Sequence, residues 1–182
     1  MASLYDIGFP TLSGILKTEL AILKKAEAWA AEKGIKTSEL TEARIYEDMH
    51  PLHFQVLIIL NTTRSAITQI TGRELPPLEK PELTMDESFA LLEETIKIFE
   101  EVQPEKITVK ENDTVTLSTK VKQFPMPAIA FVQEYALPNA FFHLNMTYAI
   151  LRMKGVPVGK MDYLKNFWRR VDFGDQSSGK SS

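Results

Sequence analysis

The sequence predicts a mainly α-helical (all-α) protein, an up-and-down bundle of about four long helices with a short extra helical segment and a small β-hairpin before the last core helix. Apolar residues recur every three or four positions along four long stretches. Prolines and glycines stand where these stretches begin and end. We expect one domain over residues 1–171 and a polar, disordered tail over residues 172–182, which are rich in glycine and serine.

The first half of the chain contains two of the expected core helices. One covers residues 10–33, with a proline in its first turn and Gly34 as its stop, and a short helical segment follows at residues 38–43. The other covers residues 51–71 and stops at Gly72. The residues of the first helix that we expect to face inward are Leu12, Ile15, Leu16, Leu20, Leu23 and Ala26.

The second half begins with an extended, proline-rich crossover at residues 75–81. Thr84 with Glu87 three positions later forms a capping box, which opens a third helix that runs to about Val102. The alternating apolar residues of the expected hairpin, which ends before Pro125, are Val115, Leu117, Val121 and Phe124.

The last core helix is expected over residues 127–153. It contains Pro138, which should kink it or split it in two, because proline lacks the N–H of one backbone hydrogen bond and clashes with the preceding turn.

Composition excludes several classes of function. The 182 residues are 44% hydrophobic and 25% charged, with a net charge of −3 and no cysteine. The acidic balance argues against nucleic-acid binding, and the lack of cysteine excludes thiolate catalysis and disulfides. The longest wholly apolar run, Val56 to Leu60, is far too short for a membrane span, and we expect a cytoplasmic protein. Phosphate-binding glycine loops and serine-nucleophile or zinc motifs are absent from the sequence.

Polar residues interrupt the apolar faces of two expected helices. Asn139 and His143 are four residues apart and therefore share a face of the last helix, and Gln55 points inward on the second. Asp48 precedes that second helix, where a carboxylate can also act simply as an N-terminal cap. Buried polar groups must be paired, so these residues form a satisfied internal network, a ligand pocket or a metal site. His50 and His53, beside Pro51, either belong to a solvated helix start or direct one imidazole toward the pocket.

A family resemblance follows from these residues. The segments that carry it are Asp48–Leu52, Gln55–Val56, Leu137–His143, Tyr148–Arg152 and Gly155–Leu164. Together they resemble an uncharacterised branch of the DinB/YfiT-like superfamily of four-helix bundles, the domain of unknown function numbered nineteen ninety-three, over nearly the whole chain from Tyr5 to Leu164. The resemblance implies a four-helix bundle, often a homodimer, with a site at one mouth of the bundle.

The resemblance also implies a metal site, but this sequence lacks some of the histidines that would form it. Metal-binding relatives use three histidines, two of them in an H-x-x-x-H pair on the last core helix. Here the matching pair is Asn139-x-x-x-His143, and the position on the second helix carries Gln55. Amides are poor ligands for the metals that imidazole suits, so we expect no metal and no other cofactor.

The hypothesis that combines these observations is a small-molecule pocket between the start of the second helix and the kink of the last. Its polar floor would be Gln55, Asn139 and His143, and its aromatic wall Phe131, Tyr135 and Phe142, although packing alone also explains the aromatics. As an enzyme, an isomerase, cyclase or lyase, it would use His143 to move a proton. Gln55 and Asn139 would hold an oxygen of the substrate, and Asp48 would orient the imidazole. The alternatives are a ligand carrier or sensor, a structural homodimer, and a metal-dependent transferase.

Overall fold

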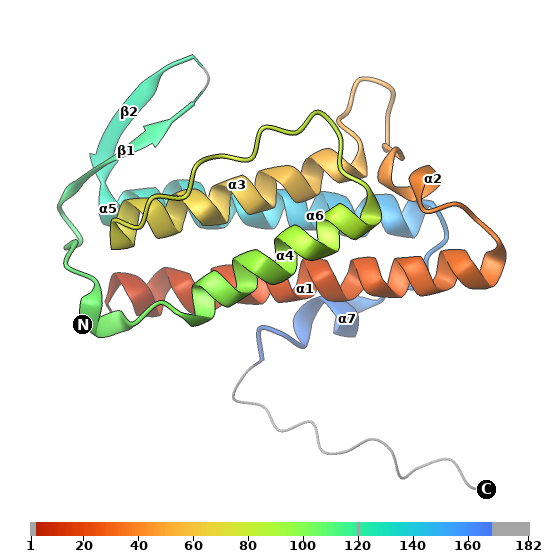
Figure 1. The fold of residues 1–182 in the computed structure, drawn as a ribbon, viewed down its shortest axis with the longest axis horizontal. Coiled ribbons are helices and arrows are strands. Elements are labelled where there is room, and N and C mark those ends of the chain that lie inside the picture. Colours follow the sequence, from red (N-terminus) through yellow and green to blue (C-terminus); the bar gives the residue numbers. More distant parts are fainter. Residues whose placement is uncertain (1–2, 120, 169–182) are drawn as a thin grey trace, which may run out of the picture.

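The structure, a computed structural model, describes residues 3–119 and 121–168. Within these ranges four long helices lie side by side as a bundle (Figure 1). They are α1 (Leu4–Lys33), α3 (Leu52–Thr71), α4 (Met85–Glu100) and α6 (Leu137–Met153). The mainly helical fold predicted from the sequence is therefore confirmed, while the tail expected over residues 172–182 lies outside the described residues.

Helix α1 begins six residues earlier than predicted. Ser3 and Asp6 form a capping box, in which the Ser3 backbone N–H donates to Asp6 Oδ2 (3.0 Å) and the Asp6 backbone N–H donates to Ser3 Oγ (3.2 Å). Pro10 therefore lies inside the helix and not in its first turn. The prediction of the C-terminal end was right, because Gly34 adopts the left-handed conformation (φ 67°) that ends the helix.

The boundaries of α3 and the start of α4 follow the predicted signals. Pro51 is the N-cap of α3 and Gly72, with φ 74°, is its C-cap. Thr84 and Glu87 form the expected capping box of α4, which ends at Glu100. The short helix α2 covers Ser38–Thr41, and a 3₁₀ turn covers Pro104–Lys106.

The expected break at Pro138 takes the form of a π-helical segment. The last core helix starts with the short α5 (Ala128–Ala130), continues as a π-helix over Phe131–Ala136, and becomes α6 one residue before Pro138. A proline ring clashes with the carbonyl four residues before it, and the wider π-turn relieves this clash. The helix therefore continues past the proline without a separating loop.

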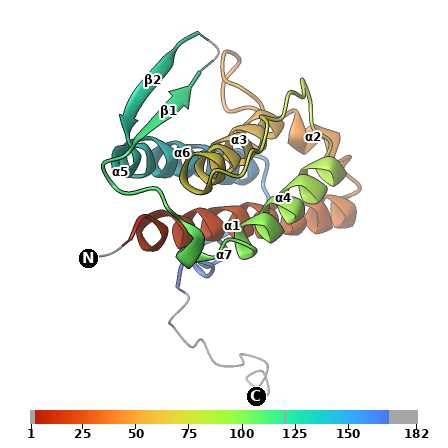
Figure 2. The same ribbon diagram turned by 60° about the vertical axis from the view of Figure 1, so that its left-hand side comes forward.

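The hairpin packs on the end of α3. Strands β1 (Thr114–Ser118) and β2 (Gln123–Pro127) are antiparallel, and β2 continues through Pro125 to Pro127, three residues further than predicted. Such prolines are tolerated because each strand of a two-stranded sheet is an edge strand. The Thr116 backbone N–H donates to Gln69 Oε1 (3.1 Å), which ties the hairpin to α3, and the strands extend away from the bundle (Figure 2).

The C-terminal segment, residues 160–167, covers α1 on the side opposite the hairpin (Figure 1). It includes α7 (Lys160–Leu164). Thr18 Oγ1 donates to the backbone oxygen of Tyr163 (3.3 Å) and accepts from Asn166 Nδ2 (3.2 Å). Gly14 permits the close approach, since a Cβ there would lie 2.9 Å from Cδ1 of Phe167.

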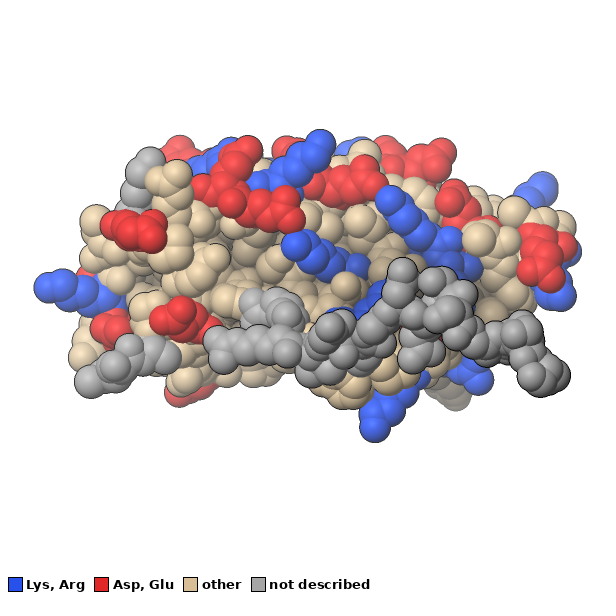
Figure 3. Space-filling model, turned by 90° about the horizontal axis from the view of Figure 1, so that it is seen from below, with Lys and Arg blue, Asp and Glu red and all other residues tan. Residues whose placement is uncertain are grey.

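Acidic and basic side chains are interspersed on the face seen in Figure 3. Between α1 and α4, Lys24 and Glu93 form an ion pair at 2.7 Å. Among the helices that the structure describes, none has the length and apolarity to cross a membrane.

Candidate functional site: the polar stripe of α6

Three polar residues on one face of α6 each bond a residue of another helix. Asn139, His143 and Thr147 are spaced by four residues and therefore lie one turn apart along the helix. Asn139 Nδ2 donates to Thr62 Oγ1 of α3 (2.7 Å). His143 Nδ1 lies 2.7 Å from Oε1 of Gln55 on α3. Thr147 Oγ1 donates to Oε1 of Glu19 on α1 (2.8 Å). We call these three residues the α6 polar stripe.

The structure brings His143 and Gln55 together, as the predicted polar floor required. The Gln55 amide is held in one orientation, since Nε2 donates to the backbone oxygens of His50 (3.0 Å) and Pro51 (3.3 Å). Its Oε1 therefore faces the imidazole and can only accept, so Nδ1 of His143 carries the proton. In the neutral ring this leaves Nε2 with a lone pair, and no residue in the described part of the chain bonds that nitrogen.

Burial keeps the imidazole uncharged. Burial first, and then the nearby His50, lower the pKa of His143 from 6.5 to about 4. Burial also lowers the pKa of His53, whose Nδ1 is buried without a partner. Near neutral pH, His143 is thus a neutral hydrogen-bond acceptor at Nε2.

Aromatic rings surround His143 on its open side. Phe142 meets the imidazole edge to face with ring centroids 5.2 Å apart, and Phe54 does so at 6.5 Å. His50 stacks on Phe54 at 3.8 Å. Phe142 is 55% exposed and His50 is also exposed, so solvent reaches this group. We call His50, Phe54 and Phe142 the aromatic rim.

Two of the three predicted wall residues lie elsewhere. Phe131 and Tyr135 belong to the π-helical segment, where their rings contact each other with centroids 5.5 Å apart. Phe131 is fully buried in the core and therefore cannot line an open pocket. Of the predicted wall, only Phe142 lies against His143.

The structure does not bring Asp48 to the imidazole. Asp48 is exposed in the loop before α3, and within the described residues no hydrogen bond or ion pair joins it to His143. It is not the cap of α3 either, because Pro51 holds that position without a side-chain bond. Gln55 orients the imidazole in its place. Asn139 is engaged with Thr62 and not with the pair.

The sequence analysis missed Glu19, the α1 partner of Thr147. Its carboxyl is fully buried, Oε2 has no partner, and burial raises its pKa from 4.5 to about 8 against the opposing hydrogen bond from Thr147. The signal was present, since Glu19 follows Ile15 by four positions on the inward face. Leu20, which we assigned to that face, is only partly buried.

A cleft of about 380 Å³ lies at a different place, between α1, the end of α4 and the C-terminal segment. The residues that line it are Tyr5, Phe9, Pro10, Ser13, Gly14, Lys17, Phe99, Glu100, Lys165 and Asn166. None of them is a predicted site residue, so this cleft gives no support to the predicted pocket.

The residues at the α6 polar stripe do not fit the metal site implied by the resemblance. Gln55 Oε1 is bonded to the imidazole, and Asn139 directs its amide N–H to Thr62. In residues 3–119 and 121–168, no group of three histidine, cysteine or acidic side chains is placed to hold a metal ion. One free imidazole nitrogen is too small a donor set for a transition metal.

Comparison with known proteins agrees with this architecture. Residues 4–164 match the family described as Domain of unknown function (DUF1993). The crystal structure of a DinB family member protein from Shewanella denitrificans is similar over 88% of this chain and 91% of its own, with 31% sequence identity and a TM-score of 0.78. No curated protein matches the chain. The chain therefore belongs to the DUF1993 family and has the fold of the DinB family.

Proposed function

We propose that the protein binds a small organic molecule on the open side of His143. Nε2 of the imidazole would accept a hydrogen bond from the ligand, and the aromatic rim would contact its apolar part. The observation that carries the proposal is the bond between His143 Nδ1 and Gln55 Oε1, because it fixes which nitrogen is free. The structural-dimer alternative expects a fully paired polar cluster, and the unpaired Nε2 favours a ligand over it.

The chemistry of the site favours a ligand with a hydroxyl or a similar donor on a flat apolar body. A neutral imidazole with its proton on Nδ1 offers no donor at Nε2, so it does not attract a carboxylate or phosphate there. The exposed ring of Phe142 can stack with a ring of the ligand. Ligands of this class include phenols and other aromatic alcohols.

Acid–base catalysis without a metal is the second candidate, because an oriented, neutral imidazole can accept a proton. It is less well supported than binding alone. With a pKa of about 4, His143 is a weak base near neutral pH. We expected the amide donors of Gln55 and Asn139 to hold a substrate oxygen, but both donors of Gln55 and one of the two donors of Asn139 are engaged within the protein. An isomerase, cyclase or lyase would therefore need a substrate with an unusually acidic proton.

Nitrogen-15 NMR of the histidine side chains tests the proposal. In the free protein we expect His143 to be protonated at Nδ1. Addition of 4-methylphenol or 2-naphthol should shift the Nε2 resonance in a saturable way, whereas toluene and naphthalene, which have no hydroxyl, should not. A proton on Nε2, or no shift with either phenol up to its solubility limit, would contradict the proposal.

Two aromatic variants provide a matched control. Phe142→Ala removes a ring of the aromatic rim and should weaken binding of 2-naphthol, whereas Phe124→Ala removes an exposed ring of the hairpin and should not. If a substrate is identified, His143→Gln separates the two candidates. A carrier or sensor then changes only in affinity, and an enzyme loses turnover.

Homodimerisation and a cytoplasmic location remain predictions. Light scattering of the purified full chain measures the first.

A further inference from the structure

The centre of the bundle contains two polar atoms that are buried without partners. Oε2 of Glu19 on α1 and Oγ1 of Thr95 on α4 are both sealed from solvent, and neither forms a hydrogen bond with the described residues. Both residues are 0% exposed. A buried, unpaired polar group costs about 1–3 kcal/mol, so each needs an explanation.

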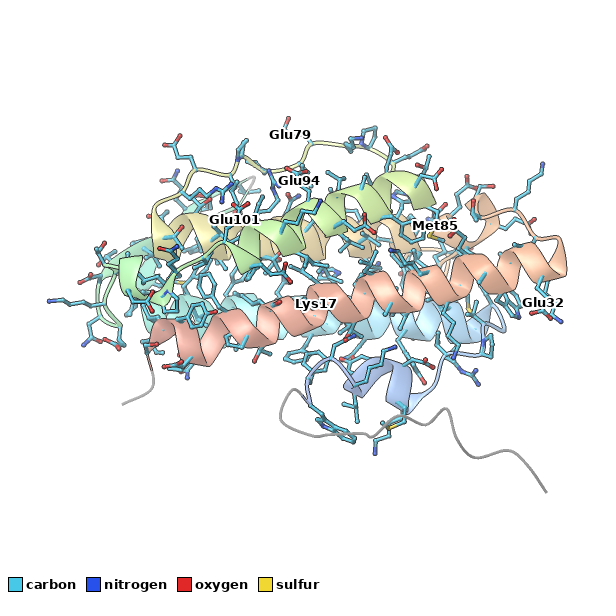
Figure 4. All side chains as sticks on the ribbon, turned by 60° about the horizontal axis from the view of Figure 1, so that its bottom comes forward. Lys17, Glu32, Glu79, Met85, Glu94 and Glu101 are labelled. Carbon is cyan, nitrogen blue, oxygen red and sulfur yellow. The ribbon has the colours of Figure 1, made fainter. Side chains whose placement is uncertain are left out.

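The register of α1 against α4 places these two residues within about one helical turn of each other along the bundle. Lys17 pairs with Glu100 (2.9 Å) and Lys24 pairs with Glu93 (2.7 Å), along the seam between the helices that Figure 4 shows from the side. Glu19 lies between the two lysines on α1, and Thr95 lies between the two glutamates on α4. Both side chains are buried, at levels of the bundle that lie between the two ion pairs.

We propose that Glu19, Thr95 and Thr147 form an internal site that holds one proton on Glu19 and one water molecule between Glu19 Oε2 and the Thr95 hydroxyl. Thr147 Oγ1 donates to Glu19 Oε1 at 2.8 Å, so the protonated oxygen is Oε2. The O–H at Oε2 needs an acceptor, and the Thr95 hydroxyl needs a partner. One water molecule satisfies both, and internal waters bind where several polar groups converge.

The surroundings of Glu19 favour the protonated form. Lys17 and Lys24, the nearest lysines along α1, are paired with glutamates at the partly exposed surface, and Thr147 is the only described residue that hydrogen-bonds the carboxyl. Tyr163 is the titratable group of the C-terminal segment that interacts electrostatically with Glu19. Its pKa is raised first by burial and then by the charge of Glu19. A carboxylate here would have no cation to balance it. The raised pKa of Glu19, about 8, agrees with this geometry.

Carbon-13 NMR of glutamate-labelled full-length protein tests the proton directly, without any substitution. At pH 6.5 we expect one carboxyl resonance at the position of a protonated acid, which titrates only above neutral pH. Glu19→Gln should remove that resonance, whereas Glu93→Gln, which changes an exposed glutamate of α4, should leave it in place. An ionised Glu19 at pH 6.5 would overturn the proposal.

The water molecule has its own test. A high-resolution crystal structure should show density within hydrogen-bond distance of both Glu19 Oε2 and Thr95 Oγ1. Thr95→Val removes the hydroxyl at nearly constant volume and should remove or displace this water while the NMR signal of the protonated Glu19 persists. A direct Glu19–Thr95 hydrogen bond, or a metal cation in place of the water, would overturn the assignment.

Discussion

Two of the polar bridges of helix α6 lie one turn apart, and each contains a titratable group. Burial shifts the pKa values of these two groups, His143 and Glu19, in opposite directions. His143 bonds Gln55 of α3 and lies partly open to solvent, whereas Thr147 bonds Glu19 of α1 in the centre of the core. Burial disfavours the charged form of each group, so it lowers the pKa of His143 to about 4 and raises that of Glu19 to about 8. Between these values both groups are neutral, and the bundle has no uncompensated charge at either bridge.

The two bridges therefore limit the stability of the fold on opposite sides of the pH range. Folded Glu19 binds its proton more tightly than the unfolded chain does, so its contribution is complete below pH 4.5 and is lost as pH rises through about 8. Folded His143 binds its proton less tightly, so stability is lost as pH falls from 6.5 toward 4. The Thr147–Glu19 bridge therefore sets the alkaline limb of the pH–stability profile, the fall in the free energy of unfolding at high pH. The His143–Gln55 bridge contributes to its acid limb, the fall at low pH.

The largest effect is expected at Glu19. The free energy of unfolding of the wild-type protein should fall by several kcal/mol between pH 5 and pH 9, since each unit of pKa shift corresponds to about 1.4 kcal/mol. Glu19→Gln keeps an oxygen for the Thr147 hydroxyl and has no ionisation, so its unfolding energy should lack this fall toward alkaline pH and should keep only the acid-side change due to His143. Urea denaturation at several pH values measures both profiles. Parallel profiles would show that Glu19 does not set the alkaline limb.

Loss of the partner of His143 should have the next largest effect. Gln55→Leu leaves the Nδ1 proton of His143 and two backbone carbonyls without their bonds to the side chain, and should destabilise the protein by about 1–3 kcal/mol at pH 7. The histidine NMR spectrum should also show a mixture of tautomers, since nothing then selects Nδ1–H. A single, unchanged tautomer in this variant would mean that Gln55 does not orient the ring.

A smaller effect is expected on the acid limb. His143→Gln should lose less stability than the wild type between pH 6.5 and pH 4, because the imidazole that must stay neutral in the fold is gone. We expect the difference to be smaller than at Glu19, since His143 is partly exposed and solvent screens its charge. Replacement of the exposed His50 by Gln is the matched control, and an equal effect in both variants would contradict the assignment.

Most of the fold was predictable because its boundaries carry local signals. Two helices end at a glycine, Gly34 or Gly72, and α4 starts at the Thr84–Glu87 capping box. Each of these signals acts through hydrogen bonds to residues only a few positions away. The error at α1 arose because Pro10 was taken as the start, while the Ser3–Asp6 capping box, a local signal of the same kind, lies seven residues earlier. In α1 the upstream capping box sets the start of the helix, and the proline lies inside it.

The site was less predictable because it depends on which partners lie across the bundle. His143 and Gln55 could be paired from the sequence, since each is polar on an apolar face. The position of Phe131 and Tyr135 could not, because the π-helical segment that contains them changes the number of residues per turn and so rotates the faces that an α-helical count predicts. Glu19 was missed by an offset of one residue on α1, where Leu20 was assigned inward.

The bond between Asn139 and Thr62 provides the smallest expected effect, and it tests whether the α6 polar stripe acts as separate bridges. We expect Asn139→Ala and Thr62→Val each to destabilise the protein, and the double variant to reveal a coupling energy of about 0.5–1.5 kcal/mol, the value of one net hydrogen bond. A second cycle that combines Asn139→Ala with Gln55→Leu should show almost no coupling, because Gln55 bonds His143 and not Asn139. Strong coupling in the second cycle would mean that Asn139, His143 and Gln55 form one network, which is one of the alternatives that the sequence left open.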